Sequence, residues 1–111
     1  MSDERRKSPR YPVDVPASVE IAGRSHPGRI RDLCRDALFV EIPGFWSIGT
    51  RVSLSAELPG GEGPVDLAGR IVRQAAPEEG VSGVAVLFDD LPPATATRID
   101  FFLAEQEPPE A

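Results

Sequence analysis

Two short segments of the sequence concentrate side chains that could bind a charged or planar ligand. Arg5, Arg6, Lys7 and Arg10 form a basic run near the N-terminus, and Arg6 and Arg10 have RxxxR spacing. A guanidinium group is a planar fork of N–H donors that fits phosphates and the acceptor edges of bases. Three interpretations follow for this run: contact with a ligand, contact with a partner protein, or a solvated tail.

The second segment is DLCRDA, residues 32–37, between two strand-like stretches. Asp32 could accept a hydrogen bond from a ligand, or it could cap the hairpin as an Asx-turn. Cys34 fits a buried small hydrophobe. A nucleophilic Cys34 with His26 as its base is disfavoured, because His26 falls at the start of a strand and no oxyanion-binding motif is visible.

Composition narrows the classes of function. A chain of 111 residues is most simply one domain. The net charge of -6 argues against binding to DNA or RNA, and a single Cys and a single His make a metal site improbable. The sequence shows no paired catalytic carboxylates and no Gly-rich phosphate loop, so an enzyme is not expected. The sequence has no apolar run of about 20 residues and no signal-like start. We therefore expect a cytoplasmic protein that does not insert into a membrane.

Period-two hydrophobicity dominates from about residue 15 to residue 90. Val15, Ala17, Val19 and Ile21 alternate with more polar residues, as in a half-buried strand. Segments rich in Gly, Pro or Ser, which are typical of turns, separate the successive alternating stretches. The expected fold is mainly β, with six short antiparallel strands forming a barrel or a folded sheet. The five later strands are HPGRIRDL, ALFVEI, RVSLSAEL, VDLAGRIVRQA and VSGVAVLF.

One helix is expected at about residues 93–105, after two prolines. Ile99, Phe102 and Leu103 recur at helical spacing, so they are predicted to pack onto the barrel. The domain organisation is then a flexible basic arm at 1–10, a single domain at 11–106, and a disordered tail at 107–111.

Phe45 and Trp46 are adjacent aromatic residues in the loop PGFWSIG. A small core cannot easily bury both rings, so one of them is expected to contact a partner protein or a second copy of the chain. Both residues are therefore candidates for a partner contact.

The two candidate segments, taken with the strand pattern, resemble the PilZ domain family. The resemblance rests on RxxxR before the first strand and on DLCRDA as a [D/N]xSxxG-type turn between the second and third strands. It extends through GTRVSLSAELPG, LAGRIVRQ and GVSGVAVLFDDL, and covers roughly residues 5–103. It implies a six-stranded antiparallel barrel with a C-terminal helix, in a bacterial, non-enzymatic signalling module linked to motility or surface behaviour.

The resemblance also implies a ligand, cyclic di-GMP. Arg6 and Arg10 would contact guanine and phosphate, Arg5 would be a further phosphate partner, and Asp32 would accept from a guanine edge. The N-terminal arm would fold over the barrel mouth when the ligand binds. The alternative is an adaptor that binds a motility or signalling protein, without nucleotide, through the basic arm and the Phe45/Trp46 loop.

The turn departs from the family pattern at two positions. Cys34 replaces Ser, and a thiol is a weaker hydrogen-bonding group than a hydroxyl. Ala37 replaces Gly, so its Cβ is expected either to strain a left-handed turn by about 1 kcal/mol or to block the base. Asp36 adds a carboxylate near a ligand with two negative charges. The ligand site expected from the sequence therefore comprises Arg5, Arg6, Arg10, Asp32, Cys34 and Ala37, with a weakened turn.

Overall fold

The computed structural model describes residues 10–60 and 63–106. The expected arm at 1–10, apart from Arg10, and the expected tail at 107–111 lie outside the described residues. The elements are β1 (Tyr11–Ile21), β2 (Arg24–Leu33), β3 (Ala37–Glu41), β4 (Arg51–Ala56), β5 (Val65–Gln74), the short 3-10 helix η2 (Pro77–Glu79), β6 (Gly83–Phe88) and α1 (Pro93–Ala104).

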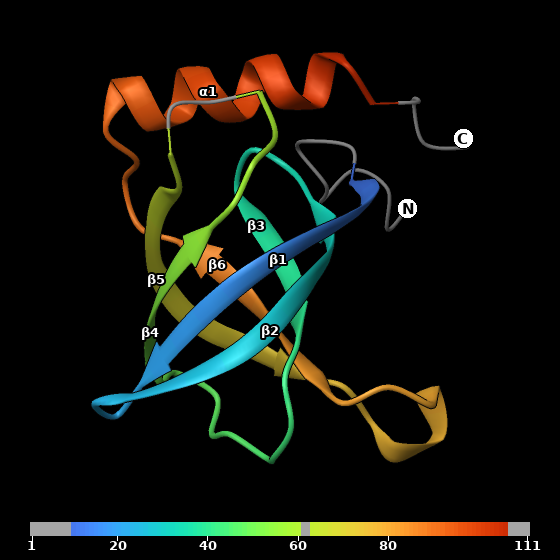
Figure 1. The fold of residues 1–111 in the computed structure, drawn as a ribbon. Helices are drawn as coiled ribbons and strands as arrows, with labels where there is room; N and C mark the ends of the chain where they lie inside the picture. Colours follow the sequence, from blue (N-terminus) through green and yellow to red (C-terminus); the bar gives the residue numbers. More distant parts are fainter. Residues whose placement is uncertain (1–9, 61–62, 107–111) are drawn as a thin grey trace, which may run out of the picture.

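The six strands form a closed barrel in the order β1-β2-β3-β6-β5-β4, and every neighbouring pair is antiparallel (Figure 1). The mainly β fold with one C-terminal helix, predicted from the sequence pattern, is confirmed. Closure leaves no long unpaired edge among the described strands for another chain to extend.

β1 begins four residues before the predicted start at about residue 15. Tyr11 pairs with Leu33 and Pro12 with Asp32, and the ladder then shifts register before Val15. Pro12 cannot donate to a ladder, so the sequence gives no sign of pairing there. The pairing matters for the candidate site, because it brings the end of the N-terminal arm to the end of β2.

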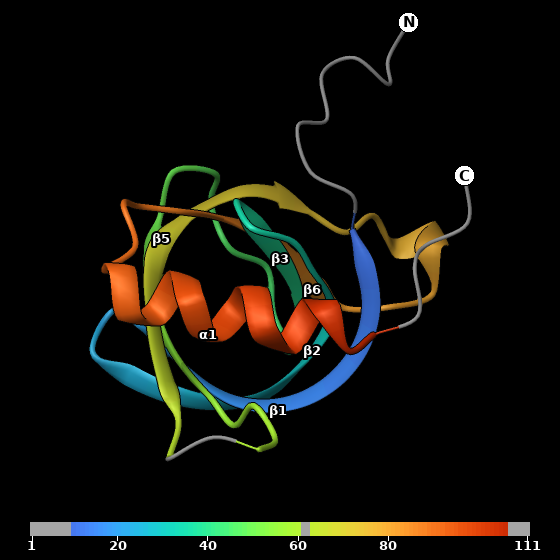
Figure 2. The ribbon, with the colours of Figure 1, turned by 90° about the horizontal axis from the view of Figure 1, so that it is seen from above.

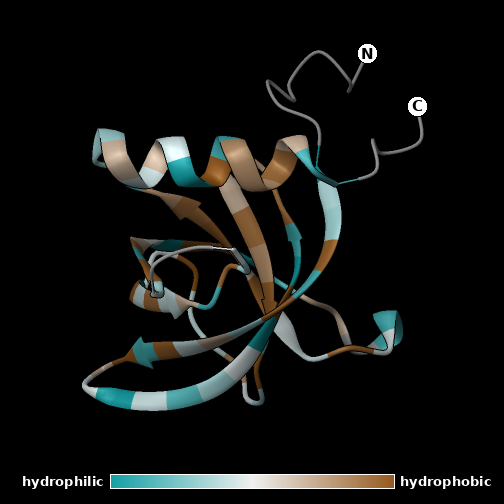
Figure 3. Ribbon diagram, turned by 45° about the horizontal axis from the view of Figure 1, so that its top comes forward, coloured by the Kyte–Doolittle hydropathy of each residue, from teal (hydrophilic) through white to brown (hydrophobic). Residues whose placement is uncertain are grey.

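The core follows the predicted alternation. Along β1, Val15, Ala17, Val19 and Ile21 are buried and the residues between them are exposed. Polar and apolar residues accordingly alternate along the strands (Figure 3). Because inward residues fill the barrel, any ligand must bind on its outer face or at an end.

Helix α1 lies across one end of the barrel, as the view along the barrel shows (Figure 2). Its buried residues are Ile99, Phe102 and Leu103, which confirms the predicted packing face. Pro92 occupies the N-cap position without a side-chain capping hydrogen bond, and Pro93 begins the helix, where a missing N–H costs nothing. The helix therefore closes the barrel end beside the β2–β3 turn.

Within the described parts of the chain, no helix is long and apolar enough to cross a membrane.

Candidate functional site

The β2–β3 turn is fixed to the barrel by backbone hydrogen bonds. The N–H of Cys34 donates to the carbonyl oxygen of Ala37 at 2.9 Å. The carbonyl oxygen of Asp36 accepts from the N–H of Phe88, at the end of β6, also at 2.9 Å. The turn therefore has a defined position at the end of the barrel that α1 covers (Figure 1).

The described end of the arm lies beside this turn. Nη1 of Arg10 is 3.9 Å from Oδ2 of Asp32, and both side chains are partly exposed, at 38% and 29%. A pair of this length and exposure contributes only about 0–1 kcal/mol to stability. Its importance is positional, because it brings the second arginine of RxxxR to the acid of the turn. Arg5 and Arg6 lie outside the described residues.

A cleft of about 1010 Å³ opens next to this pair. The β2–β3 turn forms one wall, α1 contributes Ala96, Ile99 and Asp100, and the outer face of β5 and β6 forms the floor. Val72, Ala85 and Leu87 make much of that floor apolar; further lining comes from Arg10, residues 34–37, Arg73 and residues 88–91. An apolar floor ringed by charged groups is typical of small-molecule sites.

The charges of the lining do not by themselves favour an anion. Three arginines and four aspartates line the cleft, which gives one net negative charge. All three arginines already have acidic partners: Arg10 faces Asp32, Nε of Arg35 is 2.9 Å from Oδ1 of Asp100, and Nη1 of Arg73 donates to Glu79 at 3.0 Å. A ligand with two phosphates would therefore need further cations, which Arg5 and Arg6 carry in the sequence.

The two departures from the family pattern have different structural consequences. Cys34 is buried, at 5% exposure, as predicted for a small hydrophobe. Ala22 is the one non-glycine residue with positive φ in the described chain, so Ala37 does not adopt a left-handed conformation. The predicted strain at Ala37 is therefore wrong. The other expectation stands as a prediction, because Ala37 lines the cleft and its Cβ could obstruct a base.

The Phe45/Trp46 loop lies at the opposite end of the barrel, away from α1 (Figure 1). Trp46 is half-buried: its N–H donates to Gln74 at 2.9 Å, its Nε1–H donates to the carbonyl of Pro43 at 3.1 Å, and its ring meets His26 edge-on at 5.2 Å. Phe45 is 78% exposed. The pair thus divides into a packed tryptophan and an exposed phenylalanine. Arg10 and this loop do not form one continuous surface.

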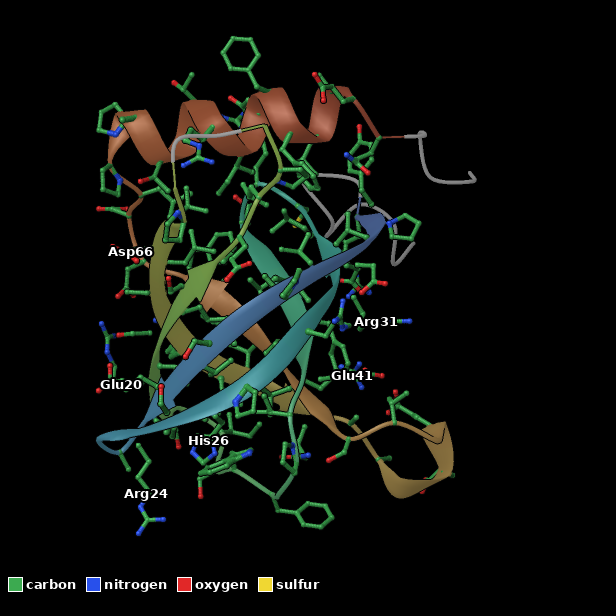
Figure 4. The ribbon with its side chains drawn as sticks, in the orientation of Figure 1. Glu20, Arg24, His26, Arg31, Glu41 and Asp66 are labelled. Atoms are coloured by element: carbon green, nitrogen blue, oxygen red, sulfur yellow. The ribbon has the colours of Figure 1, made fainter. Side chains whose placement is uncertain are left out.

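His26 and Cys34 lie at opposite ends of β2. His26 pairs with Val19 near the β1–β2 hairpin, and Figure 4 places it far from α1. The eight residue steps from His26 to Cys34 correspond to about 26 Å of strand, so the two side chains cannot form a catalytic pair. Among the described residues, no group of three or more His, Cys, Asp and Glu side chains could hold a metal ion.

Arg35, Arg73 and Asp100 line the cleft but were not among the residues predicted from the sequence. Arg73 gave a partial signal, because the alternation of the strand would place this charged residue inward; a register shift after Ile71 leaves it exposed. Its place beside the β2–β3 turn depends on β6 lying between β3 and β5, an order that the sequence pattern does not specify.

Comparison with known proteins bears on the family and on the fold. No curated protein matches the sequence. The fold is similar to a solved structure of MotI/DgrA, an inhibitor of motility from Bacillus subtilis, with a TM-score of 0.72 and 10% sequence identity. The match covers 90% of this chain and 50% of that one, so this chain spans about half the length of the neighbour.

The family comparison is more specific than the structural one. The sequence model of the PilZ domain matches residues 4–105, a span that includes both candidate segments and every described strand. The chain therefore belongs to the PilZ domain family.

Proposed function

We propose that this chain is a bacterial signalling module that binds cyclic di-GMP in the cleft beside the β2–β3 turn. It would act in the cytoplasm as a binding module rather than an enzyme, in the control of motility or surface behaviour. The observation that carries the proposal is the position of Arg10, 3.9 Å from Asp32 at the cleft rim. The family's two sequence motifs meet there, although the chain separates them by more than twenty residues.

The chemistry of the ligand suits these groups. Guanine presents O6 and N7 as adjacent acceptors, which a guanidinium can bind with two parallel hydrogen bonds. Its N1–H and N2–H edge can donate to a carboxylate such as Asp32. Arg5 and Arg6 are the proposed phosphate partners, since they would supply the cations that the described lining lacks.

The proposed site is weaker than one with the full family pattern. Cys34 offers a poorer donor than Ser, Ala37 places a Cβ at the cleft, and Asp36 adds negative charge to the lining. A loss of about 1.4 kcal/mol lowers affinity about tenfold, so two such changes have a large combined effect.

Calorimetric titration with cyclic di-GMP tests the proposal on the wild type, on Arg6→Ala/Arg10→Ala and on Cys34→Ser/Ala37→Gly. We expect binding by the wild type, loss of binding in the arginine variant, and binding tighter by about tenfold or more in the repaired turn. Equal binding by the arginine variant and the wild type would contradict the site. If neither the wild type nor Cys34→Ser/Ala37→Gly shows binding by calorimetry, nucleotide binding is contradicted altogether.

A second candidate function is a nucleotide-independent protein adaptor. It is favoured by Phe45 and Ile48, which are 78% and 62% exposed in one loop at the barrel end away from α1. Two large apolar side chains exposed close together in one loop can form an apolar contact patch. Self-association is the partner contact that can be tested directly: sedimentation of the wild type against Phe45→Ser/Ile48→Ser would show loss of a dimer if this loop joins two copies.

A further inference from the structure

On the outer face of the barrel, beside the candidate site, three residues from different strands lie together: Phe39, Gly83 and Arg73. Phe39 points outward from β3, because its neighbours Leu38 and Val40 fill the core. An outward ring would ordinarily be exposed, yet Phe39 is only 7% exposed. Gly83 lies against the tip of the Phe39 ring, and Arg73 lies over the ring.

Gly83 makes the close approach of the ring possible. A Cβ at this position would lie 2.8 Å from Cζ of Phe39 and closer still to the carbonyl oxygen of Val40. Real Cβ atoms do not come this close, so only glycine lets the ring lie against β6. The same row of the sheet continues through Ala85, which pairs with Phe39 on one side and with Arg73 on the other.

Arg73 is held over the outer face of this ring. Its Cζ lies 5.8 Å from the ring centroid of Phe39, within the range of a cation–π contact. Its Nη1 donates to Oε2 of Glu79 at 3.0 Å, and the same oxygen accepts from the N–H of Ala76 at 2.9 Å. The guanidinium is thus fixed by a ring on one side and by an anchored carboxylate at its edge.

This arrangement places Arg73 between Phe39 and the cleft. Arg73 belongs to the cleft lining and Phe39 does not, and the side chain of Arg73 remains 49% exposed. The neighbouring floor, Val72, Ala85 and Leu87, is apolar. A planar group entering the cleft meets a flat guanidinium beside a flat apolar surface.

We propose that Arg73 is a base-stacking residue, on which a purine ring of the ligand lies, with the Phe39 ring behind the guanidinium. The inference rests on the proposed function, because it assigns a further contact in the same cleft. Guanidinium planes stack on nucleobases, and stacking discriminates flat ligands without reading their edges. Because Glu79 balances its charge, Arg73 is assigned to a base rather than to a phosphate.

Calorimetric titration with cyclic di-GMP separates stacking from simple charge. Arg73→Ala removes both plane and charge, Arg73→Lys keeps the charge alone, and Arg73→Trp keeps a flat ring alone. Because stacking on one base is worth about 1–3 kcal/mol, we expect Arg73→Ala and Arg73→Lys to bind about tenfold or more weakly, and Arg73→Trp to bind like the wild type. Arg70→Ala is the matched control, since Arg70 is an exposed arginine of β5 outside the cleft lining. Circular dichroism of each variant checks that the barrel is folded.

The outcomes separate this inference from the proposed function on which it rests. If the wild type binds and Arg73→Ala binds equally well, the stacking role is overturned and the nucleotide site stands. If Arg73→Lys binds like the wild type while Arg73→Ala does not, Arg73 makes a charge contact and the stacking role is again overturned. If neither the wild type nor Cys34→Ser/Ala37→Gly binds, both proposals are overturned together.

Discussion

At the scale of single residues, the Glu79 carboxylate links the short 3-10 helix to β5. The backbone N–H of Ala76 and then the guanidinium of Arg73 donate to this carboxylate, and together they hold the pKa of Glu79 below its usual value of 4.5. A pKa that is lower in the folded state than in the unfolded state means that the charged form stabilises the fold. This stabilisation is present above the ordinary pKa and is lost as the pH falls through the folded-state value.

Glu79→Gln is therefore expected to lower the stability of the protein at neutral pH. The difference from the wild type should shrink as the pH falls below about 4.5, because the wild-type carboxyl then also loses its charge. Urea denaturation at a series of pH values measures this difference. Glu78→Gln, in the same 3-10 helix, controls for the change in net charge, and a difference that stays constant or grows in acid would contradict the assignment.

The sequence indicated some residues of the candidate site and not others. Arg10 and Asp32 were predicted to act together through the family resemblance, and the structure places them 3.9 Å apart. Arg73 was not predicted, because a period-two pattern tells which side chains face outward but not which strands are neighbours. Ala37 was predicted to be strained because the family has Gly there, and the actual backbone of this turn removes the reason for strain.

At the scale of elements, the turn of the β1–β2 hairpin contains one residue whose backbone conformation lowers the stability of the fold. Ala22 and Gly23 both have positive φ, at 53° and 78°, as a two-residue hairpin turn of type I′ requires. Gly adopts positive φ without a steric penalty, whereas an alanine in the left-handed region is disfavoured by its Cβ. The turn therefore has one suitable residue and one unsuitable residue.

Ala22→Asn is expected to raise the free energy of unfolding by about 0.5–1 kcal/mol, since Asn tolerates the left-handed region. Ala22→Val should lower it, because a β-branched side chain fits that region worst. Thermal unfolding of the two variants beside the wild type measures the effect. Equal stability of all three proteins would contradict the φ values of this turn.

Helix α1 should contribute to stability through one face only. Ile99 is buried and Phe101 is 71% exposed, although the two residues are two positions apart in the same helix. Ile99→Ala is expected to cost about 2–4 kcal/mol, whereas Phe101→Ala should change stability by less than about 0.5 kcal/mol. Chemical denaturation tests the pair, and a large loss from Phe101→Ala would show that the helix packs differently.

The elements were more predictable than the contacts between them. Six strands and one helix followed from alternation, turn residues and the spacing of Ile99, Phe102 and Leu103. The early start of β1 did not, because Pro12 conceals a pairing that the tertiary fold imposes. Likewise, β3 and β6 become neighbours only when the barrel closes, and no local pattern in the sequence encodes that closure.

At the scale of the whole molecule, the barrel separates two surfaces with different chemistry. The α1 end carries the cleft, Arg10 and the β2–β3 turn. The other end carries the loop with Phe45 and Ile48 exposed. Ligand binding at the α1 end does not require Phe45 or Ile48, so it is compatible with a contact between two copies through that loop.

The most direct test of the central claim is an NMR titration of the isotope-labelled protein with cyclic di-GMP. The proposed site predicts that the largest amide shifts lie on Asp32 and on the residues that line the cleft: 34–37, Leu87, Ala96, Ile99 and Asp100. The loop at residues 43–50 should not shift, because it lies at the other end of the barrel (Figure 1). An absence of shifts in excess nucleotide, or shifts centred on residues 43–50, would contradict the account.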